Sequence, residues 1–335
     1  VEQLCVHAVL MADSRPPLPP PAIDAEPAAD TRTDLSRFRR RAVLFVAIGA
    51  LLYLGMFAWS EALARGQADR NRFHAILSAP PTQFDYVILG ASHAAVLDYR
   101  EMNQRVERAV DGRVMNLAEV GAGVTLNRFL LDLFRERHST QAVVYIVDSF
   151  VFYSPEWNEV RIEDVELYRR APWSPTLAAR LFADDAARGA VANYLSGFSK
   201  INNEGRFEPD VFDAEGSTFD RTYRPIPQID RQRMEFLYPD GASPTVLDER
   251  PYLEQFRRLG ASLEAEGIEF IVVRPPIPPR IEEMLPNEAD FVRRLREMAG
   301  AEGFDLLDFS GVVNDREYFY DSDHLNQDGA MRRSE

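Results

Sequence analysis

The chain contains a single cysteine, Cys5, among its 335 residues. One thiol in an N-terminal tail excludes an internal disulfide, a cysteine zinc cluster and a thiol nucleophile. Lysine is equally scarce, since Lys200 is the only one, which we interpret as compositional bias. With 38 basic and 53 acidic side chains, the formal net charge is -15. Nucleic-acid binding requires a basic face, and arginines do not cluster beyond residue 41, so we expect no nucleic-acid partner.

One long segment without charge runs from Ala42 to Ser60. Its length is close to the ~20 residues that a bilayer-spanning helix needs. Four arginines lie between residues 37 and 41, whereas the following flank mixes both signs. The positive-inside rule therefore predicts a single-pass protein of a bacterial inner membrane, with a cytoplasmic N-terminus and an extracytoplasmic domain. Two alternatives stay open, namely signal-peptidase cleavage after Ala64 and a buried core helix.

The segments around this helix differ in composition. Residues 1–41 carry proline, alanine and charge but little large apolar surface, which indicates a disordered cytoplasmic leader. Met11 is an alternative start within it. Residues 61–83 are interpreted as a linker, and residues 84–335 as one domain.

From residue 84 onward, apolar strand segments alternate with helical patterns. The expected strands are 86–89, 114–117, 142–147, 269–273 and 305–309, and the expected helices are 93–110, 126–137, 252–266 and 288–301. This βαβ pattern predicts an α/β domain, a three-layer sandwich with a five-stranded parallel, flavodoxin-like sheet.

Residues 149–250 interrupt the alternation with proline, glycine and aromatic residues, which indicates an insertion subdomain of short helices over the active edge. Its aromatic side chains either build a small core of their own or face a sugar ring or an acyl chain. They are Trp157, Tyr168, Trp173, Tyr194, Phe198, Phe207, Phe219 and Tyr223.

Two short sequence motifs place candidate catalytic residues at the ends of predicted strands. Ser92 follows Gly90 at a strand-to-helix turn, where a hydroxyl is exposed beside free backbone N–H groups. Asp321 precedes His324 by three residues, close enough to orient the imidazole. An acidic turn before a terminal helix is the alternative interpretation of this second string.

A serine nucleophile needs a base, and the chain offers five histidines: His7, His74, His93, His138 and His324. We expect His93 to point elsewhere on its own helix turn, and His7, His74 and His138 to lie far from the site. His324 is therefore the expected base. Asp323 is expected to cap the short helix that begins near Asn326 or to bind nearby backbone.

These strings resemble the blocks of the SGNH (GDSL-like) hydrolase superfamily over roughly residues 84–330. The nucleophile block is similar to Gly-Ala-Ser-His with Ser92, and the last block to the string from Asp321 to His324. The second block, Asn-Leu-Gly-x-x-Gly, looks like Asn116 to Gly121. The resemblance implies that the N–H groups of Ser92 and Gly121 form an oxyanion hole.

The third block departs from the family pattern. Where Gly-x-Asn-Asp is usual, this chain has Val147, Asp148, Ser149 and Phe150. The side-chain amide donor to the oxyanion is thus missing, and the loss of one such donor can cost about 100- to 1000-fold in rate.

The membrane segment and the insertion resemble the envelope-modifying branch, which includes the D-alanyl transfer protein of teichoic-acid synthesis and alginate O-acetylation proteins. The resemblance implies a serine esterase or O-acyltransferase acting on acyl esters, chiefly acetyl esters, of a cell-envelope polysaccharide. It implies a membrane-bound O-acyltransferase as partner, no cofactor and no metal. The further substrate or supporting residues are Asn116, Asp148, Ser149, Arg274 and Asp323, with a solvated turn as the alternative for Arg274.

Two other functions stay open. One is a catalytically silent module that presents polymer to an acyltransferase. The other is a metal-dependent phosphoesterase in which Asp148, Asp321, Asp323 and His324 are the ligands.

Overall fold

The computed structural model describes residues 31–66, 71–203, 205 and 216–332. The expectations for Cys5, His7, Met11 and Phe207 therefore lie outside the described residues. The chain divides into two units, Val1–Leu54 and Gly55–Glu335.

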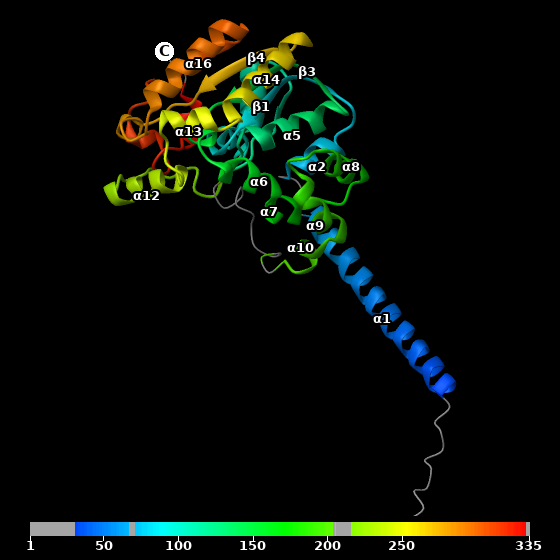
Figure 1. The fold of residues 1–335 in the computed structure, drawn as a ribbon. Coiled ribbons are helices and arrows are strands. Elements are labelled where there is room, and N and C mark those ends of the chain that lie inside the picture. Colours follow the sequence, from blue (N-terminus) through cyan, green and yellow to red (C-terminus); the bar gives the residue numbers. More distant parts are fainter. Residues whose placement is uncertain (1–30, 67–70, 204, 206–215, 333–335) are drawn as a thin grey trace, which may run out of the picture. The chain divides into compact units, whose positions relative to one another are not determined.

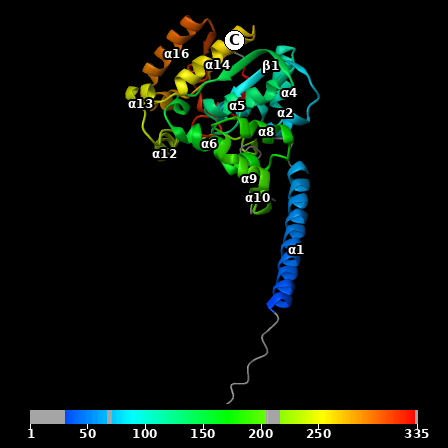
Figure 2. The same ribbon diagram turned by 45° about the vertical axis from the view of Figure 1, so that its right-hand side comes forward.

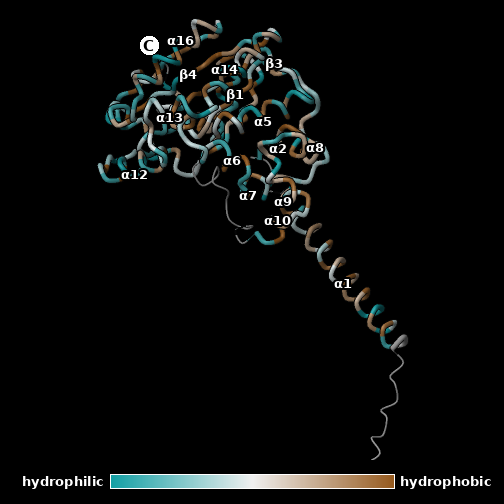
Figure 3. The backbone as a smooth tube through the Cα atoms, in the orientation of Figure 1, coloured by the Kyte–Doolittle hydropathy of each residue, from teal (hydrophilic) through white to brown (hydrophobic). Residues whose placement is uncertain are grey.

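Helix α1, Thr31–Gly66, contains the apolar segment. It is long and apolar enough to cross a membrane, and none of its apolar window is buried, which contradicts the alternative of a buried core helix. Brown apolar residues recur along it in Figure 3. The leader was expected to extend to residue 41, but residues 31–41 are helical, because arginine is a good helix former and continues the apolar helix in the N-terminal direction.

The expected linker contains a packed helix. Helix α2, Arg72–Ser78, is capped by the side chain of Asn71, which accepts a hydrogen bond from the His74 N–H at 3.0 Å. Its side chains Phe73 and Ile76 are buried in the main core. Residues 71–78 are thus part of the folded domain.

Five parallel strands form one sheet with the order β2-β1-β3-β4-β5, as the sequence predicts for an α/β domain. The strands are β1 (Gln83–Gly90), β2 (Val114–Asn116), β3 (Ser139–Ile146), β4 (Glu269–Arg274) and β5 (Asp305–Asp308). This order is that of flavodoxin-like sheets, which bind ligands where the strand order reverses. Here the reversal lies between β1 and β3, whose carboxyl ends meet at the Gly90–Ile146 pair.

Helices cover both faces of the sheet. Along β1, Val87 and Leu89 face one core cluster and Ile88 faces the other. The first cluster packs under α5 (Val124–Arg135), α14 (Tyr252–Ala265) and α16 (Glu288–Glu302). The second packs under α3 (Ser92–Ala95), α4 (Met102–Val110) and α17 (Gln327–Met331). Figures 1 and 2 show α5 and α14 side by side against the sheet.

The helix expected over residues 93–110 is wrong as a single element. It is divided into α3, the 3-10 helix η2 (Val96–Asp98) and α4. Two features break it, an extended Tyr99 after η2 and a left-handed Arg100 with φ 53°. Arg72 contacts the Asp98 carboxylate at 2.6 Å and holds the break in place.

The insertion consists of short helices, as predicted. They are η3 (Ser149–Phe152), η4 (Pro155–Trp157), α6 (Glu159–Glu163), α7 (Val165–Arg169), α8 (Pro175–Ala183), η5 (Arg188–Ala190), α9 (Val191–Ser196), α10 (Phe198–Ile201), α12 (Pro227–Leu237) and α13 (Pro244–Glu249). The remaining short helices of the domain are α15 (Pro279–Glu282) and η6 (Arg316–Tyr318).

The expectation of a separate small core in the insertion is wrong, because its buried aromatic residues belong to the two core clusters that they share with the sheet. Trp157, Tyr168, Tyr194 and Phe219 are buried, Tyr223 is half-buried, and Trp173 and Phe198 are exposed.

The insertion also holds the end of α1. Lys200 on α10 is buried and forms an ion pair with Glu61 on α1. The other Glu61 oxygen accepts a hydrogen bond from the Trp173 N–H at 2.8 Å.

Candidate active site

The turn after β1 places Ser92 at the first position of α3, where the sequence predicts it. Gly90 has φ +144°, and a Cβ there would lie 2.6 Å from the Ile146 carbonyl oxygen, so only glycine fits. Asn127 fixes this turn by accepting a hydrogen bond from the Gly90 N–H at 2.9 Å. In the first turn of a helix, backbone N–H groups have no intrahelical acceptor, and the oxyanion role of the Ser92 N–H stays a prediction.

The second block forms the neighbouring loop. Asn116 donates from Nδ2 to the Ala94 carbonyl at 3.0 Å and accepts from the Ala118 N–H at 2.9 Å, so it supports α3 rather than facing solvent. Gly121 has φ +71°, and a Cβ there would approach Trp157 to 3.3 Å. The oxyanion role of Gly121 stays a prediction.

The predicted contact between Asp321 and His324 is confirmed. Asp321 Oδ2 lies 2.8 Å from His324 Nδ1, and Oδ1 accepts the backbone N–H groups of Asp323 and His324 at 3.0 and 2.8 Å. The Tyr320 ring stacks on the imidazole with a centroid distance of 5.6 Å. His324 Nε2 is buried and has no hydrogen-bond partner among the described residues. Ser92 therefore does not donate to His324 in this structure, and the expected contact between nucleophile and base is not formed.

The expectation that His93 points elsewhere is wrong. Its Nδ1 lies 2.6 Å from Asp148 Oδ1, and its Nε2 lies 3.3 Å from the Asp323 carbonyl oxygen. Its ring centroid is 4.5 Å from that of His324, with 30° between the ring planes. The reason is the adjacency of β1 and β3, which brings the residues after both strands to the same edge.

The expected capping role of Asp323 is also wrong. Asn326 is the cap of α17, since its side chain accepts the Gly329 N–H at 2.9 Å. The Asp323 carboxylate is buried and its Oδ2 lies 3.2 Å from both Nε and Nη2 of Arg233 on α12. The sequence does not indicate Arg233, which reaches the site from the insertion.

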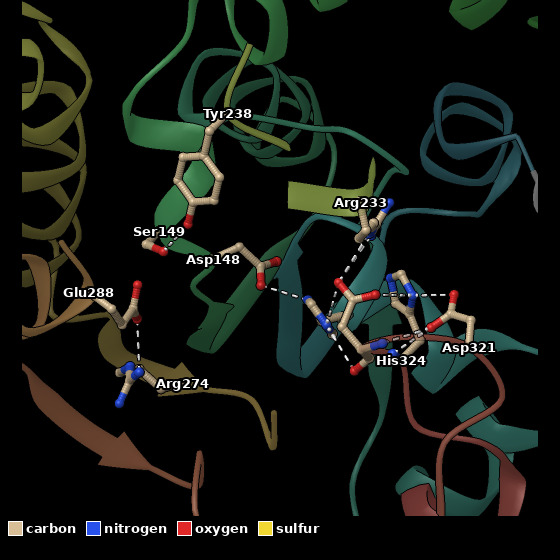
Figure 4. A network of polar contacts seen from close by, with 10 residues as sticks. Asp148, Ser149, Arg233, Tyr238, Arg274, Glu288, Asp321 and His324 are labelled. Atoms are coloured by element: carbon tan, nitrogen blue, oxygen red, sulfur yellow. Dashed lines mark hydrogen bonds and ion pairs between the residues drawn. The ribbon is translucent and has the colours of Figure 1, made fainter. Parts of the chain in front are cut away.

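Six residues of the site contact one another in a group that we call the histidine cluster. It contains three carboxylates and three basic side chains: Asp148, Asp321, Asp323, His93, His324 and Arg233. Figure 4 shows the labelled carboxylates of Asp148 and Asp321 on opposite sides of this network. Buried carboxylates require such pairing with positive charge.

The cluster sets the charge of His324. Burial disfavours the imidazolium, but the carboxylates of Asp321 and Asp323 outweigh it and raise the pKa of His324 to about 9. Burial likewise opposes ionisation of Asp321, but His324 and the backbone N–H groups hold the pKa of Asp321 well below its usual range. The resting pair at neutral pH is a carboxylate and an imidazolium.

Among the described residues, the structure brings together fewer possible metal ligands than the four that the sequence indicates. Donor atoms of His93, Asp323 and His324 lie within 4.8 Å of one another. Asp148 and Asp321, expected as further ligands, each contact an imidazole Nδ1 instead. The positive charge beside Asp323 is supplied by Arg233.

Ser149 and Arg274 belong to a second polar group next to the cluster (Figure 4). Ser149 Oγ is 2.8 Å from the Tyr238 hydroxyl. Arg274 is buried and contacts Asp308 and Glu288, each at 2.8 Å. A solvated turn is therefore wrong for Arg274, and its guanidinium is bound by protein carboxylates rather than presented to a substrate.

Comparison with known proteins assigns neither a family nor a function to this chain. No protein-family model matches the chain, and no curated protein matches it. Any function must therefore be argued from the geometry of the histidine cluster and its neighbours.

Proposed function

We propose that this chain is a membrane-anchored serine esterase or O-acyltransferase of the SGNH type. One observation carries the proposal. Asp321 holds Nδ1 of His324 at 2.8 Å, and the buried Nε2 has no partner in the described part of the chain, at the sheet edge where Ser92 follows β1. A base for a serine hydroxyl needs this combination of an oriented ring and an open second nitrogen.

In the proposed reaction, Ser92 Oγ attacks the ester carbonyl while neutral His324 takes the hydroxyl proton on Nε2. The backbone N–H groups of Ser92 and Gly121 donate to the oxyanion. Collapse of the tetrahedral intermediate breaks the ester bond, and the leaving alcohol takes the proton from His324. Water or a sugar hydroxyl then attacks the acyl-serine, by the same proton transfers in the same order.

The raised pKa of His324 limits this reaction at neutral pH. With a pKa of about 9, roughly one site in a hundred is neutral at pH 7. Acylation therefore starts from the minor, neutral form of His324.

The apolar helix α1 supports the proposed location. A helix of this length and composition supports a single membrane crossing with the N-terminus in the cytoplasm and the domain beyond the inner membrane. There the accessible acyl esters are those of envelope polysaccharides. A membrane-bound O-acyltransferase is the partner that would supply or accept the acyl group.

A second candidate is a catalytically silent module that presents polymer to such an acyltransferase. The specific observation in its favour is the third block, where Asp148 binds His93 and no side-chain amide is present to bind an oxyanion.

The two candidates are separated with the full chain in lipid nanodiscs. A serine-directed fluorophosphonate should label the wild type but not Ser92→Ala. Ser92→Ala should also hydrolyse p-nitrophenyl acetate and acetylated glycans more slowly than the wild type. Ser262→Ala, an exposed serine on α14, is the matched control and should retain both signals. An unlabelled wild type, or equal turnover in folded Ser92→Ala, would establish the silent module instead.

A further inference from the structure

An apolar cavity of about 540 Å³ lies against the histidine cluster. Apolar residues at the ends of β3 and β4, in the loops after β4 and β5, and on α17 form most of its wall. Among the described residues that line it, only His93 and Arg332 carry polar side chains. Its volume falls within the range of small-molecule sites, about 300 to 1,000 Å³.

The cavity reaches the histidine cluster at His93. Val96 and Leu97 line it, and they follow Ser92 and His93 by one helical turn, so the four residues share one face of α3 and η2. Leu325, which also lines it, directly follows His324. Ser92 and His324 do not line the cavity themselves, but His93 does, which directly follows Ser92 and whose ring centroid lies 4.5 Å from that of His324.

The wall of the cavity leaves large apolar side chains in solvent. Phe309 is 37% exposed and Val312 is 44% exposed, although both lie in the loop after β5 at the ligand-binding edge of the sheet. Covering such apolar surface is favourable, so these residues point to an apolar ligand rather than to a sugar.

We propose that this cavity, the acyl cavity, binds the hydrocarbon chain of a medium-length acyl group carried by the ester substrate. The inference rests on the proposed function, since it takes Ser92 as the residue that receives the acyl group. It changes the expected substrate class from acetyl esters to esters of longer, unbranched acids. His93 and Arg332 contribute the polar groups of the cavity wall.

The first test is a series of p-nitrophenyl esters from acetate to decanoate, hydrolysed by the full chain in nanodiscs. Burial of each additional methylene should raise kcat/KM about fourfold until the cavity is filled. Ala330→Phe should fill the cavity from α17 and reduce the decanoate-to-acetate ratio at least tenfold. Ala183→Phe, on an exposed position of α8 away from the cavity, is the matched control and should keep the wild-type ratio.

Circular dichroism establishes that each variant is folded. Val312→Phe, at an exposed position of the wall, replaces Ala330→Phe if the latter does not fold. A ratio near one in the wild type, or an unchanged ratio in both folded variants, overturns the acyl cavity.

The second test does not require turnover. Decanoate with a diazirine on its terminal carbon is photolysed with wild type and with Ser92→Ala, and labelled peptides are identified by mass spectrometry. We expect labels within residues 273–276, 309–313 and 325–332 in both proteins, and at least a tenfold loss in Ala330→Phe.

The outcomes separate the two proposals. Labelled cavity peptides without ester hydrolysis at any chain length support the cavity and overturn the serine mechanism. Hydrolysis that depends on Ser92 but not on chain length, with no cavity label above that of Ala330→Phe, overturns the cavity and leaves the serine mechanism standing.

Discussion

The imidazole rings of His93 and His324 lie with their centroids 4.5 Å apart, and a different aspartate contacts the Nδ1 of each. Asp148 contacts His93 from the loop after β3, and Asp321 contacts His324 from its own turn. Two imidazoles this close repel each other when both are charged. The surrounding carboxylates are what make a cationic His324 stable beside its neighbour.

Replacement of Asp321 by asparagine should remove the charge that stabilises the His324 imidazolium and permit the wrong tautomer. We expect Asp321→Asn to reduce kcat/KM for an ester by about 10,000-fold, as in other triads, while the fold persists. Steady-state kinetics would measure this. Asp328→Asn, an exposed aspartate on α17, is the control and should act like the wild type. A loss below tenfold in Asp321→Asn would exclude Asp321 as the orienting carboxylate.

The pH dependence of kcat/KM should reflect the pKa of His324 and the charges that surround it in the histidine cluster. Since the neutral form of His324 is the base, kcat/KM should rise about tenfold per pH unit and level off near pH 9. Asp323 raises this pKa and Arg233 lowers it. Asp323→Asn should therefore move the midpoint to lower pH, and Arg233→Gln to higher pH.

The midpoints are measured by pH-rate profiles corrected for spontaneous ester hydrolysis, and independently by NMR titration of the His324 ring. Shifts of the two variants in the same direction would contradict the assigned charges. His93, Asp148 and Tyr320 are further ionisable groups near the ring.

Stability should depend on pH through the same ion pair. The folded-state pKa of His324 lies above the ordinary value of about 6.5, so its stabilisation is complete below about pH 6.5 and is lost as the pH rises through 9. The pKa of Asp321 is lowered, so the pair also weakens when the pH falls below about 4. The pKa shifts of His324 and Asp321 arise from the same ion pair, so its contribution to stability is counted once.

The melting temperature of the wild type should therefore exceed that of His324→Gln most between about pH 4 and 6.5. The difference should shrink toward pH 10. A difference that grows with rising pH would show that His324 is neutral in the folded protein.

The ion pair between Lys200 and Glu61 should contribute strongly to the attachment of α1 to the insertion. Both side chains are largely buried, with 2% and 11% of their surfaces exposed. Lys200→Met leaves Glu61 unpaired and should destabilise the domain by about 3 to 5 kcal/mol. The double variant Glu61→Gln, Lys200→Met should recover most of this loss in thermal melts. Equal destabilisation by the single and double variants would show that the pair itself matters little.

The sequence predicts the sheet well and the helices less well. The five strands were visible as apolar runs ending at turn residues, and each prediction overlaps the observed element. The helix after β1 was predicted as continuous because the apolar spacing persists through Tyr99. Its break depends on the left-handed Arg100 and on the tertiary contact between Arg72 and Asp98, neither of which has a local signal.

The contacts of the candidate site also differ in how far the sequence could predict them. Asp321 and His324 lie three residues apart, so their contact is local and could be predicted. The contact of His93 with Asp148 had a usable signal, because residues that follow neighbouring parallel strands meet at one edge. Arg233 had none, since it reaches Asp323 across 90 residues from a helix whose packing no local pattern specifies.

The order of the strands along the chain has a consequence for biosynthesis. Ser92, His93 and Asp148 emerge from the ribosome early, whereas Asp321, Asp323 and His324 emerge only after the edge strand β5. Until then, Asp323, which contacts both His93 and Arg233 in the complete structure, is absent. On the proposed mechanism, the nascent chain therefore lacks its base, and hydrolysis of esters can begin only after the final turn has joined the finished sheet.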